Sequence, residues 1–232
     1  MKIKFYSYYK DVLDKPKPAK LFIPEAYKKM SIVVGKKIGD RSVKGCIPFL
    51  DAYQSGYIIS SPTEIHCYYD FEEKAMKFDF PVGTKTQEID NFGITTHSQE
   101  QMAPGLRYNR RTIDAIFKFN NHWRVQTPKG YSCLFTQPLN QNCPFKVIDA
   151  VVDTDDHPLP VNFPFFWTHD AEKPYIIKKG DPIIQIIPFK RDEWTMETHQ
   201  ENHKELQESH IKWRTYLYDI YKRLVWKKKS YK

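Results

Sequence analysis

The strongest constraint on the fold is a run of short apolar segments between Ile116 and Phe189. In chain order the segments are AIFKF, WRVQT, SCLFTQ, KVIDAVVD, VNFPFFW, YIIK and PIIQIIPF. Turn signals rich in Pro, Gly, Asn and Asp separate them, at residues 128–130, 140–144, 155–160 and 179–181. Several short strands at near-regular spacing, with no helical period across them, are typical of a sandwich or barrel. The sequence therefore predicts a mainly β domain.

The composition agrees with a folded domain of this kind. With 232 residues, 41% of them hydrophobic, the chain is long and apolar enough to bury a core. Aromatic residues make up 15%, and they favour strands and large core contacts. The 16 prolines shorten helices and mark the ends of strands.

Further strands are expected upstream of this run. One candidate is Lys2–Tyr9, and Gly56 leads into another at Tyr57–Ser60. Residues 64–81 alternate apolar and polar side chains in two strands joined at Glu72-Glu73. A polar loop over residues 84–111 follows, and it ends in the basic cluster Arg107, Arg110 and Arg111.

The pattern changes at Trp194, where a helical period replaces the strands. Thr198-His199-Gln200-Glu201 fits a capping box at a helix start. An apolar stripe at helical spacing follows, formed by Trp213, Leu217, Ile220, Tyr221 and Leu224. The expected organisation is an N-terminal extension (residues 1–40), a β-rich domain (41–192) and a C-terminal arm (193–232) built on an amphipathic helix.

Charge and cysteine usage indicate a compartment and a class of partner. The formal net charge is +8, which serves solubility or attracts an anionic partner, and part of it lies in the lysine runs 15–20 and 227–232. The four cysteines form no CxxC pair, and no apolar run approaches the length of a membrane span. These features predict a soluble cytoplasmic protein with free thiols, no membrane partner and no metal site of zinc spacing.

Three segments stand out within the β region. They are Gly130-Tyr131-Ser132, Val151-Val152-Asp153-Thr154-Asp155 and residues 177–187, IKKGDPIIQII. Asp153 follows Ser132 by 21 positions, and Gln185 follows Asp153 by 32. In order and spacing these segments resemble motifs of the trimeric dUTPase and dCTP deaminase superfamily.

The resemblance implies a fold and a set of site residues. The fold would be the dUTPase-like distorted β-barrel, or β-clip, usually a trimer with sites between subunits. Ser132, Gln185 and the turn glycine Gly180 would contact phosphate, because hydroxyl groups and turn N–H groups bind phosphate oxygens. Asp153 would be the catalytic residue that orients an attacking water. A nucleotide hydrolase of this kind would use Mg²⁺.

The chain also departs from that family. Asp156 stands where a dUTPase carries an aromatic residue, and a lysine-rich tail replaces the Gly-rich closing segment. The acidic motif associated with Mg²⁺ is echoed only loosely, at Leu50-Asp51-Ala52-Tyr53. Whether the protein is an enzyme therefore stays open.

Over most of its length the chain resembles a family of bacteriophage and bacterial proteins that has no established activity. The segments that carry this resemblance are CIPFLDAYQSGYII, TPKGYSCLFTQPLN, VNFPFFW, KKGDPIIQIIPFKRDEW and YKRLVWKKKSYK. It implies a phage-type protein that acts in the host cytoplasm.

Three functional hypotheses follow. The first is a nucleotide-binding protein diverged from dUTPase-like hydrolases. The second is a non-enzymatic phage structural, assembly or host-interaction protein that forms a homo-oligomer through its arm. The third is nucleic-acid binding through the basic tail.

Several of the residues that suggest these hypotheses also have purely structural interpretations. Asp153, Asp155 and Asp156 could form an acidic turn with no ligand. His199 and His203, spaced i and i+4, could clasp a metal ion, or together with His210 they could lie on a solvated helix face. Trp226, among lysines and arginines, could dock another subunit or a base, whereas Trp123 and Trp167 are expected in the core.

Overall fold

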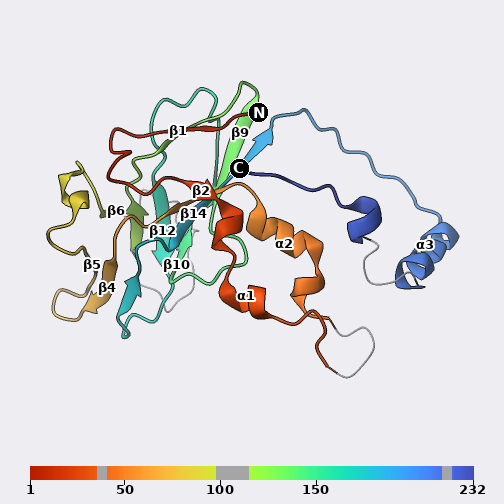
Figure 1. Ribbon diagram of the computed structural model, residues 1–232, viewed down its shortest axis with the longest axis horizontal. Helices are drawn as coiled ribbons and strands as arrows, with labels where there is room; N and C mark the ends of the chain where they lie inside the picture. The colour runs from red at the N-terminus through yellow and green to blue at the C-terminus, as the bar shows by residue number, and fades with distance from the viewer. Residues whose placement is uncertain (36–40, 98–114, 216–220) are drawn as a thin grey trace.

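A computed structural model describes residues 1–35, 41–97, 115–215 and 221–232 of the chain (Figure 1). The chain is mainly β, and its strands are β1 Lys4–Tyr6, β2 Lys17–Pro18, β3 Tyr57–Ser60, β4 Ile65–Asp70, β5 Ala75–Asp79, β6 Ile94–His97, β7 Ile116–Phe119, β8 Arg124–Gln126, β9 Tyr131–Thr136, β10 Phe145–Val147, β11 Ala150–Val152, β12 Phe163–Trp167, β13 Tyr175–Ile177 and β14 Pro182–Lys190. The helices are α1 Glu25–Lys29, α2 Ile47–Gln54 and α3 His203–Thr215. Shorter helical turns lie at Ala19–Phe22, Val43–Gly45, Lys85–Glu88 and Tyr221–Val225, the last of them π-helical.

The described strands pair into four antiparallel sheets. The largest has five strands in the order β11-β9-β14-β3-β2, and a four-stranded sheet has the order β10-β12-β7-β6. Two smaller sheets have the orders β13-β4-β5 and β1-β8. Within the described ranges no sheet closes on itself, so these pairings form open sheets rather than the closed barrel that the family resemblance implied.

All seven apolar segments between Ile116 and Phe189 contain strands, as predicted. The segment KVIDAVVD holds two, because the chain changes sheet at Ile148-Asp149. The Ile148 N–H donates to Pro164 O at 2.8 Å, beside β12. The Asp149 carboxylate accepts from Thr136 Oγ1 at 2.7 Å, at the end of β9. This turn therefore fixes the point at which the two larger sheets are joined.

The core lies between these sheets and is rich in aromatic side chains. Phe119 and Phe165 stack with their ring centroids 4.3 Å apart. Trp123 and Trp167 are 5% and 1% exposed, which confirms their predicted place in the core. Large aromatic side chains bury much apolar surface, so they contribute strongly to the stability of this core.

The N-terminal segment takes part in the β structure. β1 pairs with β8, and β2 pairs with β3 at the edge of the five-stranded sheet. The described part of residues 1–40 is therefore tied into the sheets by backbone hydrogen bonds. None of the described helices combines the length and the apolar character needed to cross a bilayer.

Some elements differ from the sequence expectations. α2 lies in a segment expected only to be buried, and β6 lies within the predicted polar loop, whose basic cluster Arg107, Arg110 and Arg111 falls outside the described residues. The capping box at Thr198 is wrong as a helix start. α3 begins at His203, and the side chain of Asn202 accepts from the Lys204 N–H at 3.0 Å.

A local capping signal does not make a helix without packing to support it. Of the predicted apolar stripe, Leu217 and Ile220 lie outside the described residues, as does the side chain of Trp213.

Candidate functional site

The family resemblance implied that Ser132 and Asp153 are site residues, and their side chains are in contact in the structure. β11 pairs with β9 through Val152↔Cys133, so the same register places the next residues, Asp153 and Ser132, opposite each other. The Ser132 hydroxyl donates to Asp153 Oδ1 at 2.6 Å. Both residues therefore lie at one edge of the five-stranded sheet, where β9 begins and the outer strand β11 ends.

Arg191, which the sequence did not single out, completes this cluster. It follows β14, whose Phe189 pairs with Ser132, and its N–H donates to Gly130 O at 2.9 Å. One guanidinium nitrogen lies 3.0 Å from Ser132 Oγ and 3.1 Å from Asp153 Oδ1. The same guanidinium pairs with the carboxylate of Asp155. The only sequence signal was a basic residue directly after a strand, and its partners depend on strand order.

The charges of the cluster are already paired. A hydrogen bond from Ser132 and the nearby Arg191 guanidinium lower the pKa of Asp153. Hydrogen bonds from Arg191 and from the Gly130 N–H hold the pKa of Asp155 well below its usual range. A general base needs a pKa near the working pH and a free oxygen beside its substrate. These carboxylates are held in their ionised form, which makes them weak bases.

Ser132 offers no accessible phosphate contact. The residue is 0% exposed, and its hydroxyl already lies between Asp153 and Arg191. The outer rim of the cluster carries a further ion pair of Lys129 with Asp156, at 2.7 Å. The arrangement thus resembles the structural interpretation of the acidic turn, with Arg191 added to it.

Gln185 is placed elsewhere. The residue is 0% exposed, and its side-chain N–H groups donate to Ala52 O at 2.9 Å and Ser55 O at 2.6 Å. Its side-chain oxygen accepts from the Leu139 N–H at 2.8 Å. Gln185 therefore satisfies carbonyl groups at the C-terminal end of α2, which have no partner within the helix.

Gly180 lies at the opposite end of β14 from Arg191. It occupies a turn with φ +88°, a conformation that favours glycine, and its N–H donates to Ser61 O at 2.8 Å. Gln185 is about 13 Å along β14 from Phe189, the partner of Ser132. The structure thus brings together Ser132 and Asp153 but does not bring Gln185 and Gly180 to them.

The cluster does not fit Mg²⁺. Magnesium prefers oxygen ligands that are free to coordinate it, and here a guanidinium already occupies the space between the two carboxylates. Across the described ranges, no group of three or more His, Cys, Asp or Glu residues is arranged to hold a metal ion.

No family model matches this chain, and no curated protein is detectably similar to it in sequence. The site must therefore be judged from its own geometry.

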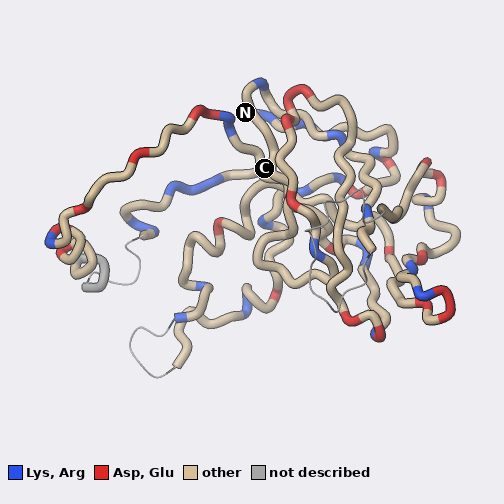
Figure 2. Tube along the Cα trace, turned by 180° about the vertical axis from the view of Figure 1, so that it is seen from behind, with Lys and Arg blue, Asp and Glu red and all other residues tan. Residues whose placement is uncertain are grey.

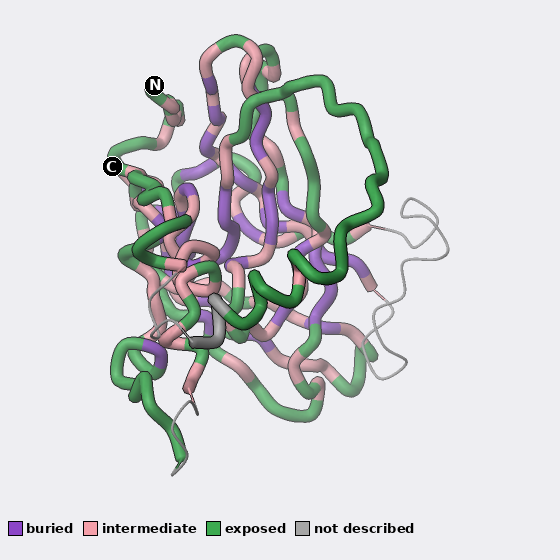
Figure 3. The backbone as a smooth tube through the Cα atoms, turned by 90° about the vertical axis from the view of Figure 1, so that its right-hand side faces the viewer, coloured by how far each residue is buried: buried purple, intermediate pink, exposed green. Residues whose placement is uncertain are grey.

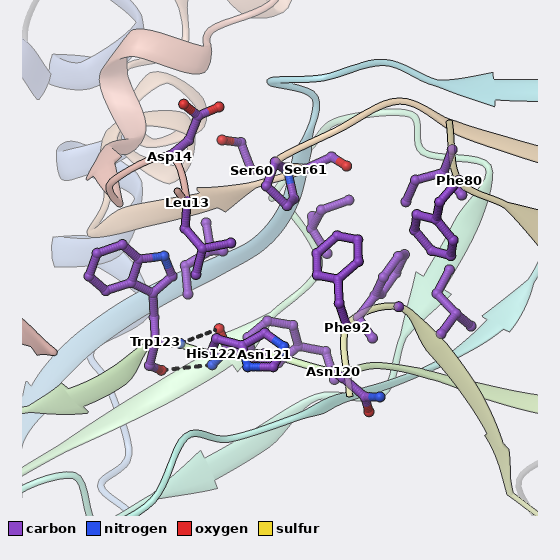
Figure 4. Close-up of a pocket in the computed structure, with 18 residues that line it drawn as sticks. Leu13, Asp14, Ser60, Ser61, Phe80, Phe92, Asn120, Asn121, His122 and Trp123 are labelled. Atoms are coloured by element: carbon purple, nitrogen blue, oxygen red, sulfur yellow. Dashed lines mark hydrogen bonds between the residues drawn. The ribbon is translucent and has the colours of Figure 1, made fainter. Parts of the chain in front are cut away.

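Two hollows lie on either side of His122 and Trp123. The smaller is a cavity of about 60 Å³ with almost wholly apolar walls, shown in Figure 4 between Leu13, Phe80, Phe92 and Trp123. A volume of this size holds only a few water molecules. It is too small for a nucleotide or a similar organic ligand.

The larger hollow is a groove of about 700 Å³, within the usual size range for small-molecule sites. We call it the tyrosine groove. Its lining residues are Phe5, Tyr6, Ser7, Tyr8, Tyr9, Lys10, Lys15, Pro16, His122, Trp123, Arg124, Pro158 and Pro160. Three of them are permanent cations, and no described residue that lines the groove carries a carboxylate. An anionic ligand with a flat ring would suit such walls.

The aromatic walls are held in place by hydrogen bonds. The Tyr9 hydroxyl donates to Asp90 Oδ2 at 3.0 Å. The backbone N–H of Trp123 donates to the Asn121 side-chain oxygen at 2.9 Å. The Asn121 side-chain nitrogen in turn donates to the backbone Trp123 O at 2.7 Å (dashed lines in Figure 4). The Arg124 guanidinium lies 4.4 Å from the centre of the Tyr6 ring, a cation–π contact.

Tyr8, by contrast, is 94% exposed, and its ring meets that of Tyr9 edge to face at 5.2 Å. Burial lowers the pKa of His122, which therefore remains neutral at physiological pH.

Proposed function

We propose that this protein binds a nucleotide in the tyrosine groove and does not hydrolyse it. One observation carries the proposal, namely that exposed tyrosine rings and three cations face one groove without a carboxylate among the described lining residues. Aromatic rings stack on bases of any sequence, and each stacked base contributes about 1–3 kcal/mol. Lysine and arginine neutralise the phosphates.

The absence of hydrolysis in this proposal rests on the Ser132 cluster, which consists of Ser132, Asp153, Asp155 and Arg191. Asp153 and Asp155 are paired with Arg191, and Ser132 is buried between them. These residues support the end of the sheet in this proposal rather than chemistry on a phosphate.

The relationship with dUTPase-like hydrolases belongs to the same proposal. The segments that resemble that superfamily lie on β9, on β11 and the turn after it, and on β14, which are neighbours in one sheet. Their motif order supports a diverged relative whose original phosphate residues have taken structural roles. On the basis of the resemblance to phage proteins, the proposed binding takes place in the cytoplasm of a bacterial host.

Calorimetric titration of the full-length chain with deoxynucleoside triphosphates tests the proposal. Nucleosides and inorganic triphosphate serve as separate probes of the ring and of the phosphates. We expect the affinity for the whole nucleotide to exceed both, and to fall with rising salt because phosphate contacts are electrostatic. The nucleotide should be recovered intact after long incubation.

Variants of the groove locate the site. Tyr8→Ala removes an exposed ring without opening the core, and should weaken binding about tenfold. The double variant Lys10→Gln/Lys15→Gln should flatten the salt dependence. The matched control is Lys85→Gln/Lys179→Gln, which alters exposed lysines outside the groove.

The proposal fails if no nucleotide binds at millimolar concentration. It fails equally if binding survives the groove variants but is lost in Ser132→Ala. The second result would indicate that the nucleotide binds at the Ser132 cluster.

A further inference from the structure

The C-terminal end of the chain returns to the body and docks on one carboxylate. The Trp226 indole N–H lies 3.1 Å from Asp51 Oδ1 and 2.9 Å from Oδ2. The Lys229 ammonium lies 2.5 Å from the same Oδ2. The Asp51 side chain is only 13% exposed, so it is covered by this contact. We call residues 221–232 the tail.

An aromatic contact extends the docking surface. The rings of Tyr231 and Tyr57 meet edge to face at 5.9 Å. The Tyr57 hydroxyl donates to Lys232 O at 3.4 Å, and the Tyr57 ring also packs against Phe5. Asp51 on α2 and Tyr57 at the start of β3 thus form a seat that recognises an indole N–H, an ammonium group and a ring at fixed spacing. We call these two residues the tail seat.

The segment that leads to the tail is loosely held. Every residue from Asp192 to Glu205 is exposed, and residues 192–202 form no helix or strand. Figure 1 shows this segment and α3 extending away from the sheets, and Figure 3 shows the same stretch as exposed almost throughout. Trp194 and Met196 are each 88% exposed, which is unusual for such large apolar side chains.

We propose that the tail seat accepts the tail of a second copy of this chain, so that two copies exchange their arms. The contacts seen within one chain show that seat and tail are complementary, and every copy carries both. Exchange of an identical segment preserves each contact and needs only a connection that can reach a neighbour. The exposed segment from Asp192 to Glu205 provides such a connection.

Charge and apolar exposure favour the same partner. Lys229, in the lysine run that Figure 2 shows as a blue stretch near the C-terminus, pairs with the Asp51 carboxylate of the seat. Trp194, Met196 and the 72% exposed Leu224 also leave apolar surface on the arm and the tail that a neighbouring copy can cover. Docking within one chain dominates at low concentration because the tail is tethered beside its own seat. Exchange should therefore increase with protein concentration.

Two complementary full-length variants test the exchange. Asp51→Lys destroys the seat and keeps the tail, whereas Trp226→Ala/Lys229→Glu destroys the tail and keeps the seat. Neither variant alone has a matching pair, so each should be monomeric in light scattering. An equimolar mixture at about 100 µM should form a heterodimer, because an intact tail meets an intact seat only across chains.

The controls keep the outcome interpretable. Thermal unfolding checks that each variant is folded, and Glu88→Lys repeats the charge reversal at an exposed site outside the seat. Glu88→Lys should behave as wild type. A mixture that contains only monomers of folded variants would overturn the proposal. If Asp51→Lys also bound oligonucleotides more tightly than wild type, the freed tail would be a nucleic-acid site instead.

Discussion

Arg191 and Asp155 form a two-point ion pair at the end of β14, and the Asp155 side chain is only 1% exposed. The Gly130 N–H also donates to Asp155, at 2.9 Å. A buried carboxylate is stable only when its charge is paired and hydrogen-bonded in this way. Arg191 directly precedes the exposed segment that leads to α3, so this pair anchors the point at which that segment leaves the sheet.

The pair predicts a specific pH dependence of stability. The pKa of Asp155 is depressed in the folded state, so its contribution is complete above its unfolded pKa of about 4 and is lost as pH falls towards the folded value. In urea unfolding, Asp155→Asn should be less stable than wild type at neutral pH. Its free energy of unfolding should also fall less below about pH 5.

Asp11→Asn, at an exposed position, is the matched control and should follow the wild-type curve. Parallel curves for wild type and Asp155→Asn would show that this carboxylate is not linked to folding.

Gln185 predicts a stability effect without a binding effect. Gln185→Leu keeps the volume but leaves the Leu139 N–H and two carbonyl groups of the α2 end without their partners. Each of these three unsatisfied buried groups costs about 1–3 kcal/mol, so we expect a loss of at least about 3 kcal/mol in chemical denaturation. Gln200→Leu in the exposed arm should change stability by less than about 0.5 kcal/mol.

The variant Gln185→Leu also discriminates between the two candidate phosphate sites. Under conditions where it is folded, its nucleotide affinity should equal that of wild type. Loss of nucleotide binding by folded Gln185→Leu would instead support the phosphate contact that the dUTPase-like motif implies for Gln185.

Local sequence patterns predicted most strands correctly. Apolar segments bounded by Pro, Gly and Asn, such as VNFPFFW and PIIQIIPF, carry enough local signal to locate a strand to within about two residues. β6 was missed because its sequence, ITTH, is short and half polar. Pro48 suits the first turn of a helix and was a usable signal for α2. The helix was missed because the segment around Pro48 is dense with aromatic residues and looked simply buried.

The candidate site was less predictable, because it depends on contacts between distant positions. Spacing correctly brought Ser132 and Asp153 together, but Gln185 matched the same pattern and is buried against α2. Arg191 gains its role from the pairing of β14 with β9, which no local pattern encodes. The tyrosine groove joins residues 5–16 with residues 122–124 through the pairing of β1 with β8.

Gly56 predicts a severe loss of stability on substitution. Its φ is +71°, and a Cβ built at this position would lie 1.9 Å from Ile186 O in the neighbouring strand β14. Gly56→Ala must therefore separate β3 from β14, and should cost more than about 3 kcal/mol or prevent folding. Gly83→Ala has a similar φ of +79° but open space around it, and should cost only about 1–2 kcal/mol. Equal melting temperatures for the two variants would contradict this account.

The burial of three of the four cysteines predicts that a single thiol reacts quickly with an alkylating reagent. Burial raises the pKa of Cys67 to about 12 and those of Cys133 and Cys143 to about 11, which suppresses their thiolates at neutral pH. Cys46 is exposed at the start of α2. A timed alkylation read by peptide mass spectrometry should therefore label Cys46 first, and Cys46→Ser should remove the fast phase. In denaturant all four cysteines should react. Fast native labelling of Cys133 would show that β9 opens readily.

The turn at Ile148-Asp149, which carries the chain directly from one large sheet into the other, has a consequence for cooperativity. β10 and β11 are separated by two residues, and each is hydrogen-bonded into a different sheet. Because only two residues join β10 and β11, neither strand can leave its sheet without disturbing the other sheet. We therefore expect the two sheets to unfold as one cooperative unit. Amide protons of β9 and β12 should then exchange with solvent at a common rate set by global unfolding, whereas those of residues 193–202 should exchange at once.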